Sequence, residues 1–338
     1  MQQHAPDIFI DALFEPEYRR HPLVLVDVGA RGGLKNNWSS ARRHLHLIGF
    51  EPDKEEFARL AAAARTGDTT TFFDVALHNR RGPVQFQIAR DRGLTSIFEP
   101  NREFLDRFPE SDRFDTVDRV QIEADTLDSL LRTRRMIDVD FIKADTQGSE
   151  LFVLEGAADA LGSLAVGAEV EVEFTPIYKG QPLFADVDRH LRSLGYLLFD
   201  LRPCYWKRSA GRGIGGPRGQ MIWADALYLK SLPALQQNLH ALPQDRRKSK
   251  LLKAISVSLL YGYHDYALEI LVNTASVLSP AERRTIERRL RQSGGHPGPL
   301  AKFPGRGKLA SAFHRLWKLC VQRDEAWSVS RAKLGNLS

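Results

Sequence analysis

An apolar run that ends in an acid and a glycine-rich turn constrains the fold more than any other feature. Residues 23–38 read LVLVDVGARGGLKNNW, with glycines at positions 29, 32 and 33. A continuous apolar run is typical of a strand that is buried on both faces of a parallel sheet. Glycines directly after such a strand let the backbone turn sharply and approach a bound molecule closely. The stretch therefore predicts a ligand site at the carboxyl end of a buried strand.

Strand-like and helix-like patterns alternate through the first two-thirds of the chain. Strands are expected at 24–29, 45–52, 69–77, 139–146, 164–174, 195–202 and 221–230. Helical patterns at 54–65 and 150–161 lie between them. This alternation predicts a doubly wound α/β sheet with right-handed crossovers. Between the third and fourth core strands, an insertion is expected to add an antiparallel strand at 82–89 and a strand running into a helix at 117–131.

The C-terminal third differs in pattern and in charge. From residue 233 to 338 the chain carries 18 Lys and Arg against 7 Asp and Glu, a formal charge of +11. Since the whole chain is +6, residues 1–232 are −5. We expect two regions, an α/β domain at 1–232 and a basic, mainly helical region at 233–338. In the latter, a Gly/Pro-rich linker at 293–308 leads to the amphipathic segment LASAFHRLWKLCVQ.

Several protein classes are not expected from this sequence. No run approaches the ~18–20 apolar residues of a membrane-spanning helix, and the first residues lack the pattern of a signal peptide. Cys204 and Cys320 show no metal-ligand spacing, so neither a metal site nor a disulfide is predicted. A cytoplasmic location is the resulting expectation.

A second acid suggests what the glycine-rich turn binds. Glu51 ends the second expected strand, 24 residues after Asp27. An acid about 20 residues beyond such a turn is placed to accept hydrogen bonds from a ribose diol. The alternative is a structural turn with a surface glutamate. The glycines read G-A-R-G-G, which does not fit the G-x-G-x-x-G fingerprint of nicotinamide cofactors.

Five segments, in order, carry a resemblance to a known family. They are VDVGARGG, IGFEPD, LTSIFEPN, IKADTQGSELFVLEGA and EVEFTPIYKGQPLF. Together they resemble the FkbM-type S-adenosylmethionine-dependent methyltransferases over residues 22–230. The chain departs from the family pattern at GARGG, where the family reads G-A-N-x-G, and at Gln147, which replaces a commoner glutamate.

The resemblance implies a class I methyltransferase (Rossmann-like) sheet with a C-terminal helical extension, and S-adenosylmethionine (SAM) as the cofactor. The turn would shape the methionine and ribose parts of the site, and Glu51 would hold the ribose. Asp74 and Val75 would border the adenine, and Asp145 would face the sulfonium. The full set of expected cofactor-binding residues is Asp27, Gly29, Ala30, Arg31, Gly32, Glu51, Pro52, Asp74, Val75 and Asp145.

Acceptor-side chemistry is expected from acids at the carboxyl edge of the sheet. Glu169, Glu171 and Glu173 share one face of the strand at 164–174. Buried acids are costly unless they line a cavity or are paired. Asp145 and Glu173 are the predicted catalytic residues, acting on a hydroxyl of a glycan, lipid-linked or polyketide-like acceptor.

Two other functions remain open on the sequence alone. The chain could be another Rossmann-type enzyme, such as a nicotinamide oxidoreductase, or a non-catalytic binding protein on a methyltransferase fold. For the basic region 233–338, three arrangements are open: docking on an anionic membrane surface at the inner face, packing on the enzyme's own helices, and contact with a second subunit in a homo-oligomer. It contains no nucleic-acid reader motif, so no specific nucleic acid is expected as a partner.

Overall fold

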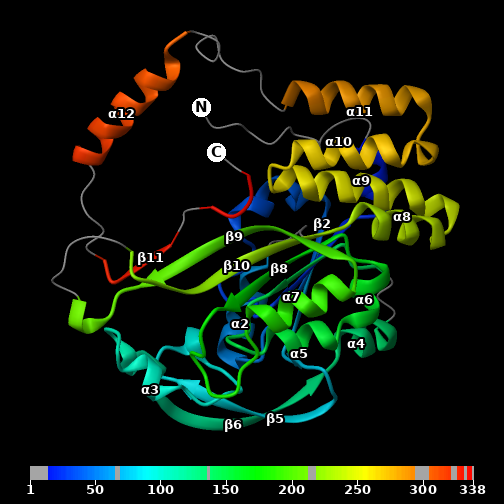
Figure 1. Cartoon of the computed structure of the whole chain (residues 1–338). Helices are drawn as coiled ribbons and strands as arrows, with labels where there is room; N and C mark the ends of the chain where they lie inside the picture. Colours follow the sequence, from blue (N-terminus) through cyan, green and yellow to red (C-terminus); the bar gives the residue numbers. More distant parts are fainter. Residues whose placement is uncertain are drawn as a thin grey trace.

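A large sheet with helices on both faces forms the body of the molecule (Figure 1). The computed structural model describes residues 14–64, 69–134, 138–211, 218–293, 304–320, 326–330 and 333–336. From one edge to the other, the strands are β11 (Ser328–Ser330), β9 (Tyr196–Trp206), β10 (Gln220–Lys230), β8 (Gly167–Glu173), β7 (Phe141–Ala144), β1 (Leu23–Val28), β2 (Leu45–Phe50) and β3 (Thr69–Phe73).

The strand directions create a ligand-binding edge. Strands β1, β2, β3, β7 and β8 run parallel, whereas β10 is antiparallel to both β8 and β9. The chain proceeds from β1 outward to β3 and then returns to β7 on the other side of β1. Strand order therefore reverses between β1 and β7, where open α/β sheets bind ligands beyond the carboxyl ends of their strands. This topology confirms the predicted doubly wound fold.

Four short helices cover one face of the sheet. They are α4 (Leu127–Thr133), α5 (Glu150–Glu155), α6 (Ala158–Ser163) and α7 (Phe184–Ser193), and their apolar side chains share a core with the inner strands. A single helix was expected over 150–161, but the chain bends at Gly156 between α5 and α6. A Cβ at Gly156 would lie 2.1 Å from the backbone oxygen of His78, so only glycine allows this close approach. A helix of ten residues, α2 (Lys54–Ala63), follows β2.

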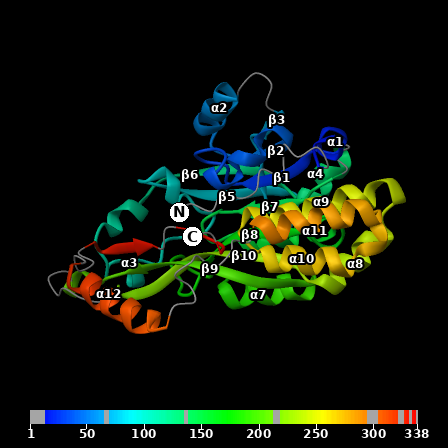
Figure 2. The same ribbon diagram turned by 90° about the horizontal axis from the view of Figure 1, so that it is seen from above.

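The C-terminal helices cover the opposite face (Figure 2). They are α8 (Leu232–Ala241), α9 (Gln244–Leu260), α10 (His264–Asn273) and α11 (Pro280–Ser293), joined there by α1 (Glu15–Arg20). Leu251 of α9 belongs to the same apolar core as Leu23 of β1 and Leu227 of β10. The expected boundary after residue 232 stays a prediction, but these helices and the sheet share one core.

Buried ion pairs tie α9 to the chain that enters β7. Lys253 Nζ lies 3.2 Å from Asp138 Oδ2 and 2.7 Å from Asp140 Oδ2. Lys250 also bonds to both acids. Although burial opposes ionisation, the two ammonium groups lower the pKa of Asp138 to about 2. Each charge in this cluster is compensated, as buried charges must be.

The insertion forms a separate three-stranded sheet. Its order is β4 (Ala76–Leu77), β6 (Thr116–Asp125), β5 (Gly82–Ala89), with β5 and β6 antiparallel. A short helix, α3 (Arg102–Leu105), lies between β5 and β6 in the chain. The strand expected at 82–89 is confirmed, and the strand expected from 117 runs into α4 as predicted.

The last helix, α12 (Arg306–Cys320), exposes apolar side chains to solvent. Leu309, Phe313 and Leu316 are 49%, 62% and 57% exposed. Most of the Gly/Pro-rich linker before α12 lies outside the described residues. Within the described parts of the chain, no helix has the length and apolar character needed to span a bilayer. Docking of this region on an anionic surface stays a prediction.

The buried cluster on α9 gives a stability prediction. Lys253→Met removes charge-assisted bonds to Asp138 and Asp140 while Lys250 and Arg246 still compensate these acids, so the free energy of unfolding should fall by about 1.5–3 kcal/mol. The matched control is Lys179→Met, which removes an exposed pair with Glu99 and should cost about 1 kcal/mol or less. Urea unfolding measures both variants. Equal, small losses would contradict the role of the cluster.

Candidate functional site

The glycine-rich turn after β1 packs directly against the end of β7. Gly29 has φ of +73°, and a Cβ there would lie 2.0 Å from the backbone oxygen of Asp145. The Gly29 amide donates to the Phe50 carbonyl at 3.0 Å. Gly32 also has positive φ, +82°, but nothing lies within 4 Å of its Cβ position. The glycine at 29 is thus needed both for backbone conformation and for space.

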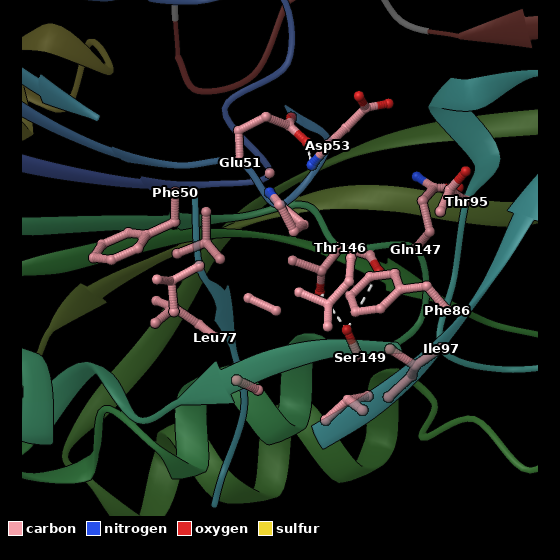
Figure 3. Close-up of a pocket in the computed structure, with 18 of the residues that line it drawn as sticks. Phe50, Glu51, Asp53, Leu77, Phe86, Thr95, Ile97, Thr146, Gln147 and Ser149 are labelled. Carbon is pink, nitrogen blue, oxygen red and sulfur yellow. Dashed lines mark hydrogen bonds between the residues drawn. The ribbon is translucent and has the colours of Figure 1, made fainter. Parts of the chain in front are cut away.

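A cavity of 840 Å³ opens at this edge (Figure 3). The ends of β1, β2, β7 and β8 form one wall, and the inserted sheet forms the other. Seven of the ten expected cofactor-binding residues line it: Gly29, Arg31, Glu51, Pro52, Asp74, Val75 and Asp145. Among the described residues, Asp27, Ala30 and Gly32 are not part of this lining.

Glu51 is held at one end of the cavity. It is only 5% exposed, and its Oε1 accepts the backbone N–H of Asp53 at 3.0 Å. Burial raises the pKa of Glu51 above its ordinary value. Asp53 in turn caps α2 by accepting the amides of Glu55 and Glu56. A carboxylate has lone pairs beyond the one used here, so Glu51 can accept hydrogen bonds from a ligand.

Asp145, Gln147 and Glu171 form a hydrogen-bonded group at the other end. Gln147 Nε2 lies 2.8 Å from Glu171 Oε2 and 3.3 Å from Asp145 Oδ1, and so donates toward both acids. Gln147 adopts φ of +57°, a left-handed conformation that is uncommon outside glycine. Its Oε1 accepts from the Tyr178 hydroxyl at 3.1 Å. Both ends of the amide are therefore used to hold the group together.

The pKa values of the two acids shift in opposite directions. Burial and the nearby Asp145 charge raise the pKa of Glu171 well above its ordinary value. For Asp145, burial opposes ionisation, but the Lys143 ammonium and hydrogen bonds from Glu171 and Gln147 give a lowered pKa. Asp145 is thus the more acidic carboxyl of the two.

A buried ion pair between Lys143 and Asp27 lies next to the Asp145–Gln147–Glu171 group. Lys143 Nζ lies 2.9 Å from Asp27 Oδ1 and 3.8 Å from Asp145 Oδ2. The side chains of Lys143 and Asp27 are 10% and 3% exposed. Although burial disfavours the ammonium, the charges of Asp27 and Asp145 raise the pKa of Lys143. Asp27 therefore joins β1 to β7 rather than facing the cavity.

The three glutamates of β8 have different environments. Glu169 is paired with Lys35 at 2.7 Å and accepts from the Tyr261 hydroxyl at 2.8 Å. Glu171 lines the cavity. Glu173 is 3% exposed and, within the described structure, is not among the cavity-lining residues. The acceptor role predicted for Glu173 stays a prediction, while the geometry brings Glu171 together with Asp145.

Some residues of the site were not assigned a role from sequence. Lys143 stands two residues before Asp145, so strand alternation places both side chains on one face. This alternation is the sequence pattern from which Lys143 could have been assigned to the site. Tyr178 lies in a loop and offered no such pattern. The cavity lining also includes apolar side chains, among them Phe86 and Ile97. Alternation in 82–89 predicted a strand there but did not indicate that its side chains line a cavity.

In the described part of the chain, no cluster of three or more His, Cys, Asp or Glu side chains has an arrangement that could hold a metal ion. The reversed strand order, with the glycine-rich turn and the acid at the end of β2 beside the cavity, is that of a class I methyltransferase fold.

Comparison with known proteins identifies the family. The model of the FkbM methyltransferase domain matches residues 27–198. This match covers half of the chain, so the protein belongs to the FkbM methyltransferase family. A curated relative, the 2-O-methyltransferase NoeI of Sinorhizobium fredii, is 28% identical over an alignment of 178 residues that covers 49% of this chain and 70% of NoeI.

Two solved structures show lower similarity. The FkbM methyltransferase of Methylobacillus flagellatus KT is 16% identical, with a TM-score of 0.36 over 62% of this chain and 43% of that one. The present chain thus spans less than half of that protein. The magnesium protoporphyrin IX methyltransferase ChlM of Synechocystis PCC 6803, with bound SAM, is 9% identical, with a TM-score of 0.33 over 67% of this chain and 80% of ChlM.

The turn gives a paired prediction for stability. Gly32→Ala meets open space and should cost only the strain of positive φ, about 1–2 kcal/mol. Gly29→Ala adds a clash with Asp145, so the combined loss should be about 2–5 kcal/mol. Chemical denaturation compares the two variants. A Gly29 variant as stable as the Gly32 variant would show that the β1 turn and β7 do not meet as described.

Glu150, next to the site, gives a pH prediction. Burial, with a contribution from the Asp145 charge, raises the pKa of Glu150 from 4.5 to about 7. Between these values the folded chain keeps a proton that the unfolded chain has lost, so stability falls as pH rises.

Between pH 5 and 6.5, the free energy of unfolding should therefore fall with pH more steeply in wild type than in Glu150→Gln. The two slopes should differ by about 1.4 kcal/mol per pH unit. Urea unfolding at several pH values provides the measurement. The Glu150 charge also raises the pKa of Glu171 and of Glu173, so its removal flattens the pH profile in the same direction through these two acids. Parallel pH profiles for the two proteins would contradict the assignment.

Proposed function

We propose that the protein is a SAM-dependent O-methyltransferase that acts on an acceptor hydroxyl. The observation that carries this proposal is a single cavity with Glu51 at one end and the Asp145–Gln147–Glu171 group at the other. Family membership supports methyl transfer, and the name of the relative NoeI supports oxygen as the atom that is methylated.

The residues present fit the cofactor. Gly29 lines the cavity, and its missing side chain lets the turn after β1 lie directly against the Asp145 backbone. Glu51 would accept hydrogen bonds from the ribose hydroxyls, and Asp74 with Val75 would border the adenine. The Asp145–Glu171 end would face the sulfonium, because one carboxylate charge there favours a cation. When bound, SAM supplies an electrophilic methyl group on a positively charged sulfur.

The chain would supply a proton acceptor and a fixed geometry. Asp145 is the ionised acid at the edge of the cavity, so it would take the proton that the acceptor hydroxyl loses as its oxygen forms the new C–O bond. Gln147 and Lys143 would keep the Asp145 carboxylate in place. Holding the acceptor oxygen in line with the methyl group would provide much of the rate. Glu171 replaces Glu173 in this proposal as the partner of Asp145.

The test begins with cofactor binding. In Glu51→Ala, affinity for S-adenosylhomocysteine should fall at least tenfold, because each charge-assisted hydrogen bond contributes about 1.5–3 kcal/mol. The control is Glu103→Gln, which alters an acid whose side chain is 90% exposed and should bind as wild type does. Isothermal titration calorimetry gives both affinities.

Calorimetry also tests the alternative that the cavity binds a nicotinamide cofactor. Wild type is expected to bind S-adenosylhomocysteine and to show no heat of binding with NAD. Binding of NAD alone would contradict a methyltransferase and favour an oxidoreductase. Unchanged affinity in Glu51→Ala would show that the ribose assignment is wrong.

A further inference from the structure

The cavity has two walls of different chemistry. Acids and amides at the strand ends form the first, as described above. The inner face of the inserted sheet forms the second, and strand register places its side chains together, since Val84 opposes Ile122 and Phe86 opposes Val120. With Ile97 from the following loop, the apolar side chains of this wall are Val84, Phe86, Ile88, Ile97, Val120 and Ile122.

Part of this apolar wall stays accessible, although Val84 and Ile88 are buried. Phe86, Ile97 and Ile122 are only partly buried, although they pack on the small core of Ala76, Val84 and Ala124. The alternate positions of the same strands are polar, and Arg119 Nε donates to Gln87 Oε1 at 2.8 Å. Accessible apolar surface that is concentrated on one face of a sheet marks a binding surface.

Hydrogen bonds connect the loop of this wall to the group of acids. Ser96 Oγ donates to the Gln147 carbonyl at 2.6 Å. The Tyr178 hydroxyl lies 3.0 Å from the Leu94 carbonyl and 3.1 Å from Gln147 Oε1, so it can bridge the two segments. The loop that carries Ile97 is therefore anchored to the residue that joins Asp145 and Glu171.

Figure 3 shows the same arrangement of the side chains. Phe86 and Ile97 lie on the Gln147 side of the cavity, whereas Phe50 and Leu77 lie on the opposite side. The cavity thus has apolar surface at both ends. Phe50 and Leu77 are placed for the adenine, beside the strand that carries Glu51. Phe86 and Ile97 are placed for whatever brings its hydroxyl to Asp145.

We propose that the acceptor carries its hydroxyl on an apolar aliphatic or aromatic segment, which binds against Phe86, Ile97 and Ile122. This inference rests on the proposed function, because it takes the cofactor to fill the Glu51 end. A free, fully hydroxylated sugar would leave the wall unmatched and would lose hydrogen bonds to water there. An apolar segment instead gains from burial of its surface.

The experiment uses simple alcohols as probes of the wall. Binding of 1-butanol, 1-hexanol and 1-octanol is measured calorimetrically on the full chain saturated with S-adenosylhomocysteine. Affinity should rise with chain length, by up to about three- to fourfold per added methylene when it is fully buried. Because the cofactor end is filled, this gain reports on the remaining part of the cavity.

Variants distinguish the wall from other apolar surfaces. Phe86→Ala should lower 1-octanol affinity at least fivefold and leave S-adenosylhomocysteine affinity within twofold of wild type. Ile97→Ala is the second variant and should act in the same direction. The control is Gln85→Ala, on the outward face of β5, which should change neither affinity. Circular dichroism melting confirms that each variant is folded.

Three results would overturn the inference. Affinity could be independent of chain length, 1-octanol and S-adenosylhomocysteine could exclude each other, or Phe86→Ala could weaken S-adenosylhomocysteine as much as 1-octanol. The last two would assign the wall to the cofactor and leave the proposed function intact. Failure of wild type to bind S-adenosylhomocysteine is a separate result, which contradicts the proposed function itself.

Discussion

The buried ion pair between Lys143 and Asp27 is the interaction on which the site depends. It joins the two strands that flank the switch point, with Nζ and Oδ1 2.9 Å apart. Removing one partner of a buried pair leaves an uncompensated charge, which commonly costs about 3–5 kcal/mol. The same ammonium stabilises the charge of Asp145. One lysine therefore positions the glycine-rich turn, orders the end of β7 and keeps a neighbouring acid ionised.

Charge and shape divide the cavity into parts with separate roles. The edge formed by Asp145 and Glu171 pairs a carboxyl of lowered pKa with one of raised pKa, so it can attract a cation and still accept a proton. The inserted sheet contributes apolar surface and, through Ser96, is fastened to the same edge. The insertion between β3 and β7 thus supplies one wall of the cavity at the switch point. In the proposed function, this wall would contact the acceptor.

Local patterns were sufficient to predict the fold and most strands of the main sheet, and seven of the ten residues predicted for the cofactor site line the cavity. Gly29 and Glu51 were identified because their spacing reflects adjacent parallel strands. The partner of Asp27 was not, since Lys143 is 116 residues away and the pair requires β1 to lie beside β7. Alternation placed Glu169, Glu171 and Glu173 on one face, but it could not say which of them reaches the cavity. The bend at Gly156 depends on contact with His78, which no helical pattern reveals.

A crystal structure of the full chain with S-adenosylhomocysteine bound would test the central claim most directly. We predict that the ribose hydroxyls contact Glu51 and that the homocysteine sulfur faces Asp145 and Gln147. The space along Phe86 and Ile97 would then remain open for the acceptor. Density for the ligand with its adenine against Phe86, or with its sulfur away from Asp145, would contradict the account.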